Sequence, residues 1–300
     1  MISFQVDENW SVDFSFITSS LDIISNYLSR PENNMRLQTS GTSSNAKQPK
    51  VKSFIIISQQ RTGSSMLNSL LASHPQIVSI GEYFIDRNQV EHRVKGVPHD
   101  RQLANLALAQ MKKKMNHGDD VKWLGFKLQE NQMKHLRFSE QTGGQEVVII
   151  PHWRRSILRQ VISHDAADNL GWKQVTPYKK SVAEQQFRDS IPTVNVQNLK
   201  KDIQDRIVQR ANITRFYTNR GHTVCPASRY EDWIQSSKTA KSVSSRVLKC
   251  LGVPLEKLST GLQPVHQDKS IEDTVSNYAE IKKTLLGSPY EYMLEDKYRV

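Results

Sequence analysis

Short runs of apolar residues alternate with longer amphipathic stretches along most of this chain, from about residue 51 onward. Four runs have the length and composition of buried strands: residues 54–57, 122–128, 146–151 and 222–230. Between and after them, apolar residues recur at helical spacing. Short buried strands that alternate with helices are typical of a mostly parallel sheet with helices on both faces. We therefore predict a three-layer α/β domain over residues 51–300, with its ligands at the carboxyl ends of the strands.

The first 50 residues follow a different pattern. Leu21, Ile24 and Leu28 could share one face of a short helix that ends at Arg30, just before Pro31. The segment that follows, to residue 49, is polar and rich in Ser, Asn, Thr and Gln, which is typical of a linker or a mobile loop. Residues 1–50 are therefore predicted to be an N-terminal appendage and linker.

The stretch from residue 53 to residue 72 carries the clearest candidate chemistry. An apolar strand is followed by the polar turn SQQRTGSS (58–65) and then by leucines at helical spacing. Such a loop can turn successive backbone N–H groups toward one point, where the N-terminus of the next helix also favours an anion. Arg61 adds a cation, and Thr62, Ser64 and Ser65 add hydroxyl groups. The loop lacks the second glycine and the lysine of a Walker A motif, and a simple capped helix after a core strand would give a similar pattern.

A second candidate site begins where the third predicted strand ends. In PHWRRSILRQVISHD (151–165), Arg155 and Ser163 lie eight residues apart across a strand-to-helix transition. A guanidinium fork and a hydroxyl group together can bind a phosphate. Solvated arginines at a helix N-terminus are the alternative interpretation of this segment.

Taken together, these segments resemble the sulfotransferases that use 3′-phosphoadenosine 5′-phosphosulfate (PAPS). RTGSS (61–65) resembles the 5′-phosphosulfate loop of that family, and the Arg155-to-Ser163 spacing resembles its 3′-phosphate site. GEYF (81–84), RYED (229–232), LGVP (251–254) and SNYAEIKKTLLGSPYEYML (276–294) match further segments in order. The sequence motifs are most similar to those of the branch that includes Nod-factor and trehalose sulfotransferases. The resemblance covers about residues 52–295. The resemblance implies a P-loop-like fold.

The resemblance also implies a role for each candidate residue. The donor would be bound by Arg61, Thr62, Gly63, Ser64 and Ser65 at its 5′-phosphate and by Arg155 and Ser163 at its 3′-phosphate. Glu82 would be the base that takes the acceptor's proton, with His152 or His164 as substitutes. Arg61 would stabilise the leaving phosphate, and Lys127 would assist at the sulfuryl oxygens. No metal is required by this scheme, and the product would be adenosine 3′,5′-bisphosphate.

The acceptor is the least determined part of the hypothesis. The family branch favours sugars or glycolipids, while the same scaffold also serves small natural products with hydroxyl or amine groups. Tyr83 and Phe84, which follow Glu82, and Trp172 in the irregular segment 171–195 supply aromatic faces for such a molecule. We therefore expect a small soluble acceptor between the Glu82 segment and the segment that follows residue 171. Core packing is the alternative role for these aromatic residues.

Composition narrows the remaining possibilities. The formal net charge of +11 suits an anionic partner, but the basic residues are dispersed and no nucleic-acid-binding signature is present. The two cysteines, Cys225 and Cys250, offer neither a disulfide framework nor metal-ligand spacing. With no evident signal peptide or membrane-length apolar run, we expect a cytoplasmic protein without a membrane span. The competing hypotheses are a nucleotide-dependent phosphotransferase (kinase) and a non-catalytic basic module.

Overall fold

The structure is a computed structural model that describes residues 51–82, 109–111, 113–114, 120–130, 147–169, 191–218, 222–262 and 269–295. Its centre is a six-stranded sheet with the order β2-β3-β1-β4-β5, in which β6 also pairs with β4. Every pairing in this sheet is parallel. The strands are β1 (Lys52–Ser58), β2 (Ile77–Glu82), β3 (Trp123–Gln129), β4 (Val147–Trp153), β5 (Thr223–Val224) and β6 (Ser228–Arg229).

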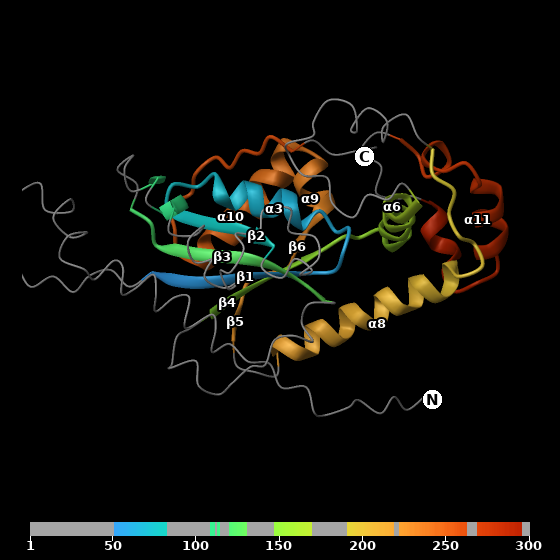
Figure 1. Ribbon diagram of the computed structural model, residues 1–300, viewed down its shortest axis with the longest axis horizontal. Coiled ribbons are helices and arrows are strands. Elements are labelled where there is room, and N and C mark those ends of the chain that lie inside the picture. Colours follow the sequence, from blue (N-terminus) through green and yellow to red (C-terminus); the bar gives the residue numbers. More distant parts are fainter. Residues whose placement is uncertain are drawn as a thin grey trace, which may run out of the picture.

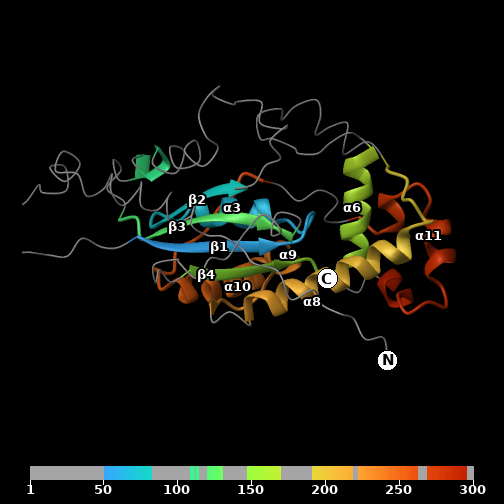
Figure 2. The same cartoon turned by 60° about the horizontal axis from the view of Figure 1, so that its bottom comes forward.

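The helices that the structure describes lie around the sheet and extend beyond its carboxyl edge (Figures 1 and 2). On one face of the sheet, Phe54 and Ile56 of β1 pack with apolar residues of three helices: α3 (Ser64–Ala72), α9 (Tyr230–Ile234) and α10 (Ser237–Leu251). Ile55 and Ile57, which point to the opposite face, are also buried. Burial on both faces explains why β1 is apolar throughout rather than alternating.

A second apolar cluster contains no strand residue and lies past the carboxyl ends of the strands (Figure 2). It joins α6 (Ile157–Asn169), α8 (Leu199–Thr218), α11 (Tyr278–Leu285) and η2 (Glu291–Glu295), with η1 (Glu272–Thr274) nearby in the chain. Because α6 begins directly after β4, this cluster fixes the direction in which the chain leaves the sheet beside the loop 59–63.

The predicted fold class is confirmed: the structure is a mostly parallel central sheet with helices around it. The predicted single strand over residues 222–230 is wrong, because two short strands, β5 and β6, replace it. Pro226 lies between them and has no N–H group to donate to β4. From the sequence, Glu231 and Asp232, which follow the predicted strand, are expected to cap the helix that runs toward Leu251, and this expectation is also wrong. Both lie inside the short α9, and Ser236 caps α10 through the backbone N–H of Thr239.

The cysteines correct a further expectation. Cys225 and Cys250 are joined by a disulfide, with their Cα atoms 5.7 Å apart. The spacing in the sequence contained no sign of the bond, because the fold brings the residue after β5 against the end of α10. Two cysteines without a disulfide framework would fit a reducing compartment, and the disulfide between Cys225 and Cys250 removes that support. Among the described residues, no helix is long and apolar enough to cross a membrane. The predicted appendage, residues 1–50, lies outside the described residues.

Candidate active site

The loop between β1 and α3 has the backbone geometry of an anion site. Arg61 and Gly63 both adopt left-handed conformations, with φ angles of 61° and 81°. Left-handed residues in such alternation turn successive N–H groups toward the same side of the chain. The backbone N–H groups of residues 61–65 donate to no other residue that the structure describes. Because α3 begins at Ser64, its N-terminal end adds positive potential at the same place.

Gly63 is required at its position for two reasons. Its positive φ is unfavourable for a residue with a side chain. In addition, a Cβ atom placed there would lie 2.2 Å from Cδ2 of Tyr230. The ring of Tyr230, from α9, thus closes one side of the loop. The guanidinium of Arg154 stacks on that ring, 5.1 Å from its centre.

The two predicted phosphate sites are in direct contact. Arg61, from the loop, donates a hydrogen bond from Nε to Oγ of Ser163 on α6, at 3.1 Å. Burial lowers the pKa of the Arg61 guanidinium, and the positive charge of Arg154 lowers it further. Two cations held this close together favour an anionic ligand between or beside them.

Arg155 is held by acidic residues whose role the sequence analysis missed. Its guanidinium forms an ion pair with Asp232. The neighbouring Glu231 accepts hydrogen bonds from the backbone N–H groups of Arg155, at 2.9 Å, and Ser156, at 3.3 Å. Glu231 thus satisfies the N-terminal end of α6 and fixes the segment that carries both arginines. The RYED segment was the signal in the sequence, although nothing there specified these partners.

The predicted base and the predicted lysine are adjacent. Lys127 Nζ lies 3.2 Å from a carboxylate oxygen of Glu82 and donates to Oγ of Ser65 at 2.9 Å. Glu82 and Lys127 face each other in the β2–β3 register, after an irregularity in β2 that follows Ser79. Both side chains are mostly buried, with exposed fractions of 11% and 7%. Through Lys127, the carboxylate of Glu82 is thus linked to Ser65 in the first turn of α3.

His152 is fully buried and uses both ring nitrogens. Nε2 lies 3.0 Å from the carbonyl oxygen of Thr62, and Nδ1 lies 3.1 Å from Oγ of Ser228. Because a carbonyl only accepts, Nε2 must carry the proton and donate. Burial lowers the pKa of His152 to about 4, and the charge of Lys127 also lowers it. His152 is therefore neutral at physiological pH, in one tautomer.

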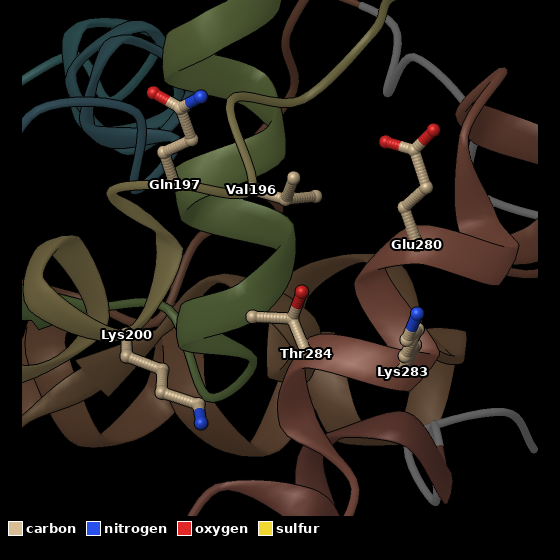
Figure 3. A pocket seen from close by; sticks show the side chains of 6 residues that line it. All are labelled: Val196, Gln197, Lys200, Glu280, Lys283 and Thr284. Atoms are coloured by element: carbon tan, nitrogen blue, oxygen red, sulfur yellow. The ribbon is translucent and has the colours of Figure 1, made fainter.

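The structure thus brings most of the predicted site residues to the carboxyl edge of the sheet. Three of the predicted acceptor-binding residues, Tyr83, Phe84 and Trp172, lie outside the described residues. A surface groove of about 590 Å³ lies elsewhere, beside the start of α8 and α11. Figure 3 shows the residues that line it, and none is a predicted site residue: Val196, Gln197, Lys200, Glu280, Lys283 and Thr284. No group of three potential metal ligands occurs among the described residues.

One comparison with known protein families gives a match. Residues 53–148 match the model of the sulfotransferase family. No curated protein matches the chain. Among solved structures, the sulfotransferase domain from the curacin biosynthetic pathway is 16% identical. The alignment covers 69% of this chain and 75% of that domain, with a TM-score of 0.33. The family match supports a sulfotransferase. The matched residues include Glu82, Lys127 and the loop of residues 59–65, which we call the anion loop.

Proposed function

We propose that this protein is a sulfotransferase that moves the sulfuryl group of PAPS to a hydroxyl or amine group of a small acceptor. The observation that carries the proposal is the meeting of the 59–65 loop, the Arg61–Ser163 contact and the Glu82–Lys127 pair at one edge of the sheet. The family match over residues 53–148 supports the same class of reaction.

The residues of the loop fit a donor that carries phosphate groups. The N–H groups of residues 61–65 are turned to one side, and Gly63 leaves the backbone without a side chain there. Arg61 and these N–H groups bind the 5′-phosphate and stabilise the negative charge that develops on it. Arg155 and Ser163 bind the 3′-phosphate, which distinguishes the donor from ATP. Their role is to position the donor.

On the acceptor side, Glu82 takes the proton that the acceptor loses. The bound donor supplies the sulfuryl group: a bond forms from the acceptor oxygen or nitrogen to sulfur, and the bond from sulfur to the 5′-phosphate oxygen breaks. Lys127, which contacts both Glu82 and Ser65, lies between the base and the loop. Its ammonium group stabilises the sulfuryl oxygens. We propose that Tyr83, Phe84 and Trp172 contribute to acceptor binding.

Activity with labelled PAPS tests this proposal across three acceptor panels: oligosaccharides, phenols or steroids, and guanidinium or amine metabolites. We expect transfer of label to at least one panel by the wild-type protein and a strong loss in Arg61→Ala. The acceptors that react identify the acceptor class, including the choice between O- and N-sulfation. Transfer of phosphate from ATP to the same panels, without sulfuryl transfer, would contradict the proposal.

A further inference from the structure

The conformation of the anion loop is fixed by hydrogen bonds from side chains to its backbone carbonyl groups. Four consecutive backbone carbonyl oxygens, those of residues 59–62, each accept a hydrogen bond from a side chain. In chain order the donors are Thr62 Oγ1 (2.9 Å), Gln160 Nε2 (2.7 Å), Arg154 Nη1 (3.4 Å) and His152 Nε2 (3.0 Å). Three of these donors come from outside the loop, from β4, α6 and the short connection between them.

These contacts determine which way the loop presents its N–H groups. The N–H and C=O of one peptide group point in opposite directions. Hydrogen bonds that hold the carbonyl groups of residues 59–62 on one side of the loop therefore leave the N–H groups of the following residues on the other side. The left-handed conformation of Arg61 costs roughly 1–3 kcal/mol and persists only when the surroundings fix it. The N–H of Gln60 is itself bound by the carboxylate of Glu130, at 3.2 Å, so the backbone is fixed on both sides of Gln60.

Two of the side chains that hold the loop cannot reach a ligand. His152 and Gln160 are both 0% exposed. His152 is fixed in turn, because Trp233 Nε1 donates to Oγ of Ser228 at 2.6 Å and that hydroxyl pairs with the histidine. A residue in this position can influence the donor only through the loop.

We infer that His152 and Gln160 are positioning residues that hold the 60–62 backbone in its anion-binding conformation and thereby set the affinity for the donor. This inference rests on the proposed function, which supplies the donor. It also gives His152 a different role from the substitute base considered from the sequence. A neutral histidine whose only N–H is donated to Thr62 serves the loop, and its other nitrogen serves Ser228.

The chain offers a matched control in a second buried histidine. His74 is 1% exposed, and its Nε2 lies 3.0 Å from the carbonyl oxygen of Pro254 while its Nδ1 accepts from the N–H of Gln76. It resembles His152 in burial and in bonding to a carbonyl, but it follows the opposite end of α3 from the loop. A general loss of packing should therefore appear equally in both histidine variants.

The test uses His152→Asn, His152→Gln and His74→Asn in the full chain. Asparagine keeps a polar group near Ser228 but cannot reach Thr62, whereas the longer glutamine restores a donor near the position of Nε2. Affinity for adenosine 3′,5′-bisphosphate is measured by calorimetry. Amide hydrogen exchange of residues 59–65 is measured without any ligand, and melting temperatures report global stability.

We expect His152→Asn to weaken bisphosphate binding about ten-fold, as expected for one buried hydrogen bond, and to speed amide exchange in the loop. His152→Gln should recover most of both effects. His74→Asn should lower the melting temperature without changing affinity or loop exchange. If His152→Asn does not fold, Gln160→Met, which removes only the donor to Gln60, should give the same loss of affinity and the same faster exchange.

The outcomes separate the inference from the proposed function. If the wild-type protein does not bind the bisphosphate, the proposed function is wrong and the inferred effect on donor affinity falls with it. Loop exchange still reports whether His152 holds the backbone. If the wild-type protein binds it and the His152 or Gln160 variant binds equally well with unchanged loop exchange, the inference is overturned. Equal effects of His74→Asn and His152→Asn on affinity would also overturn it.

Discussion

The donor side and the acceptor side of the proposed site are built from different chemical groups. On the donor side, the binding groups are backbone N–H groups of the 59–65 loop, fixed by hydrogen bonds from β4, α6 and their connection. On the acceptor side, the chemistry lies in two charged side chains, Glu82 and Lys127, which form one ion pair between neighbouring strands. Backbone N–H groups in fixed positions suit the binding of phosphate groups, and charged side chains suit a step in which a proton is transferred. Changes on the donor side should therefore alter affinity, and changes on the acceptor side should alter turnover.

The largest effect should follow from Glu82→Gln, which keeps the size of the side chain but cannot accept the proton. We expect turnover to fall by roughly 10²–10⁴-fold, while affinity for adenosine 3′,5′-bisphosphate stays within a few-fold of the wild-type value. Steady-state kinetics with labelled donor and calorimetry measure the two quantities. Glu256→Gln, at an exposed position, is the control. Full activity in Glu82→Gln would remove the base from this side of the site.

Arg155→Ala should give the next largest effect, and on affinity. The variant loses the proposed charged contact to the 3′-phosphate and leaves Asp232 without its closest partner, so we expect a loss of about 2–4 kcal/mol in bisphosphate binding. Arg246→Ala is a matched control, because Arg246 also faces Asp232, at 4.0 Å, but is half exposed. Unchanged affinity in Arg155→Ala, or equal losses in both variants, would show that Arg155 does not bind the donor.

The pH dependence of stability tests whether His152 is neutral in the folded state. Its pKa falls from 6.5 to about 4 on folding, so between these values the unfolded chain binds more protons. The contribution is complete above pH 6.5 and is lost as the pH falls toward 4, by at most about 3 kcal/mol. Urea unfolding between pH 7 and pH 4 should show a smaller pH dependence in His152→Asn than in the wild-type protein. Parallel curves would mean that His152 is charged or exposed.

The smallest expected effect is on stability. It is tested by comparing alanine substitutions at two glycines that have left-handed backbone conformations. Gly252 has φ 64° and open space where a Cβ atom would lie, whereas at Gly63 that atom would meet Tyr230. We expect Gly252→Ala to cost about 1 kcal/mol of stability and Gly63→Ala about 2 kcal/mol, because the ring must also move. Only Gly63→Ala should weaken bisphosphate binding. Equal costs, with donor affinity unchanged in both variants, would show that the contact with Tyr230 does not shape the loop.

The sequence was informative where a feature is local. The apolar run at 54–57 and the turn at 58–65 predicted β1, the loop and α3, because strand, turn and helix here are consecutive in the chain. Ligands bind at the carboxyl ends of parallel strands, and this rule indicated that Glu82, Lys127 and Arg155 lie at one edge of the sheet. The contacts between distant segments were not predictable. Spacing alone could not show that Arg61 bonds to Ser163, or that Glu231 satisfies the start of α6.

The same limit explains the errors. The apolar content of residues 222–230 suggested one strand, but Pro226 divides it, and each half pairs with a different part of β4. The bond between Cys225 and Cys250 depends on how α10 returns to the sheet, which no spacing encodes. The contact of His152 with the carbonyl oxygen of Thr62, 90 residues away in the chain, was likewise not predictable from spacing.

Calorimetric titration with adenosine 3′,5′-bisphosphate, beside ATP with Mg²⁺, tests the central claim most directly. The loop, Arg61, Arg155 and Ser163 together predict tight binding of the bisphosphate, with heat that disappears in Arg155→Ala, and much weaker binding of ATP. Equal or tighter binding of ATP with Mg²⁺, or no binding of the bisphosphate by the wild-type protein, would contradict the assignment of this site to a sulfuryl donor.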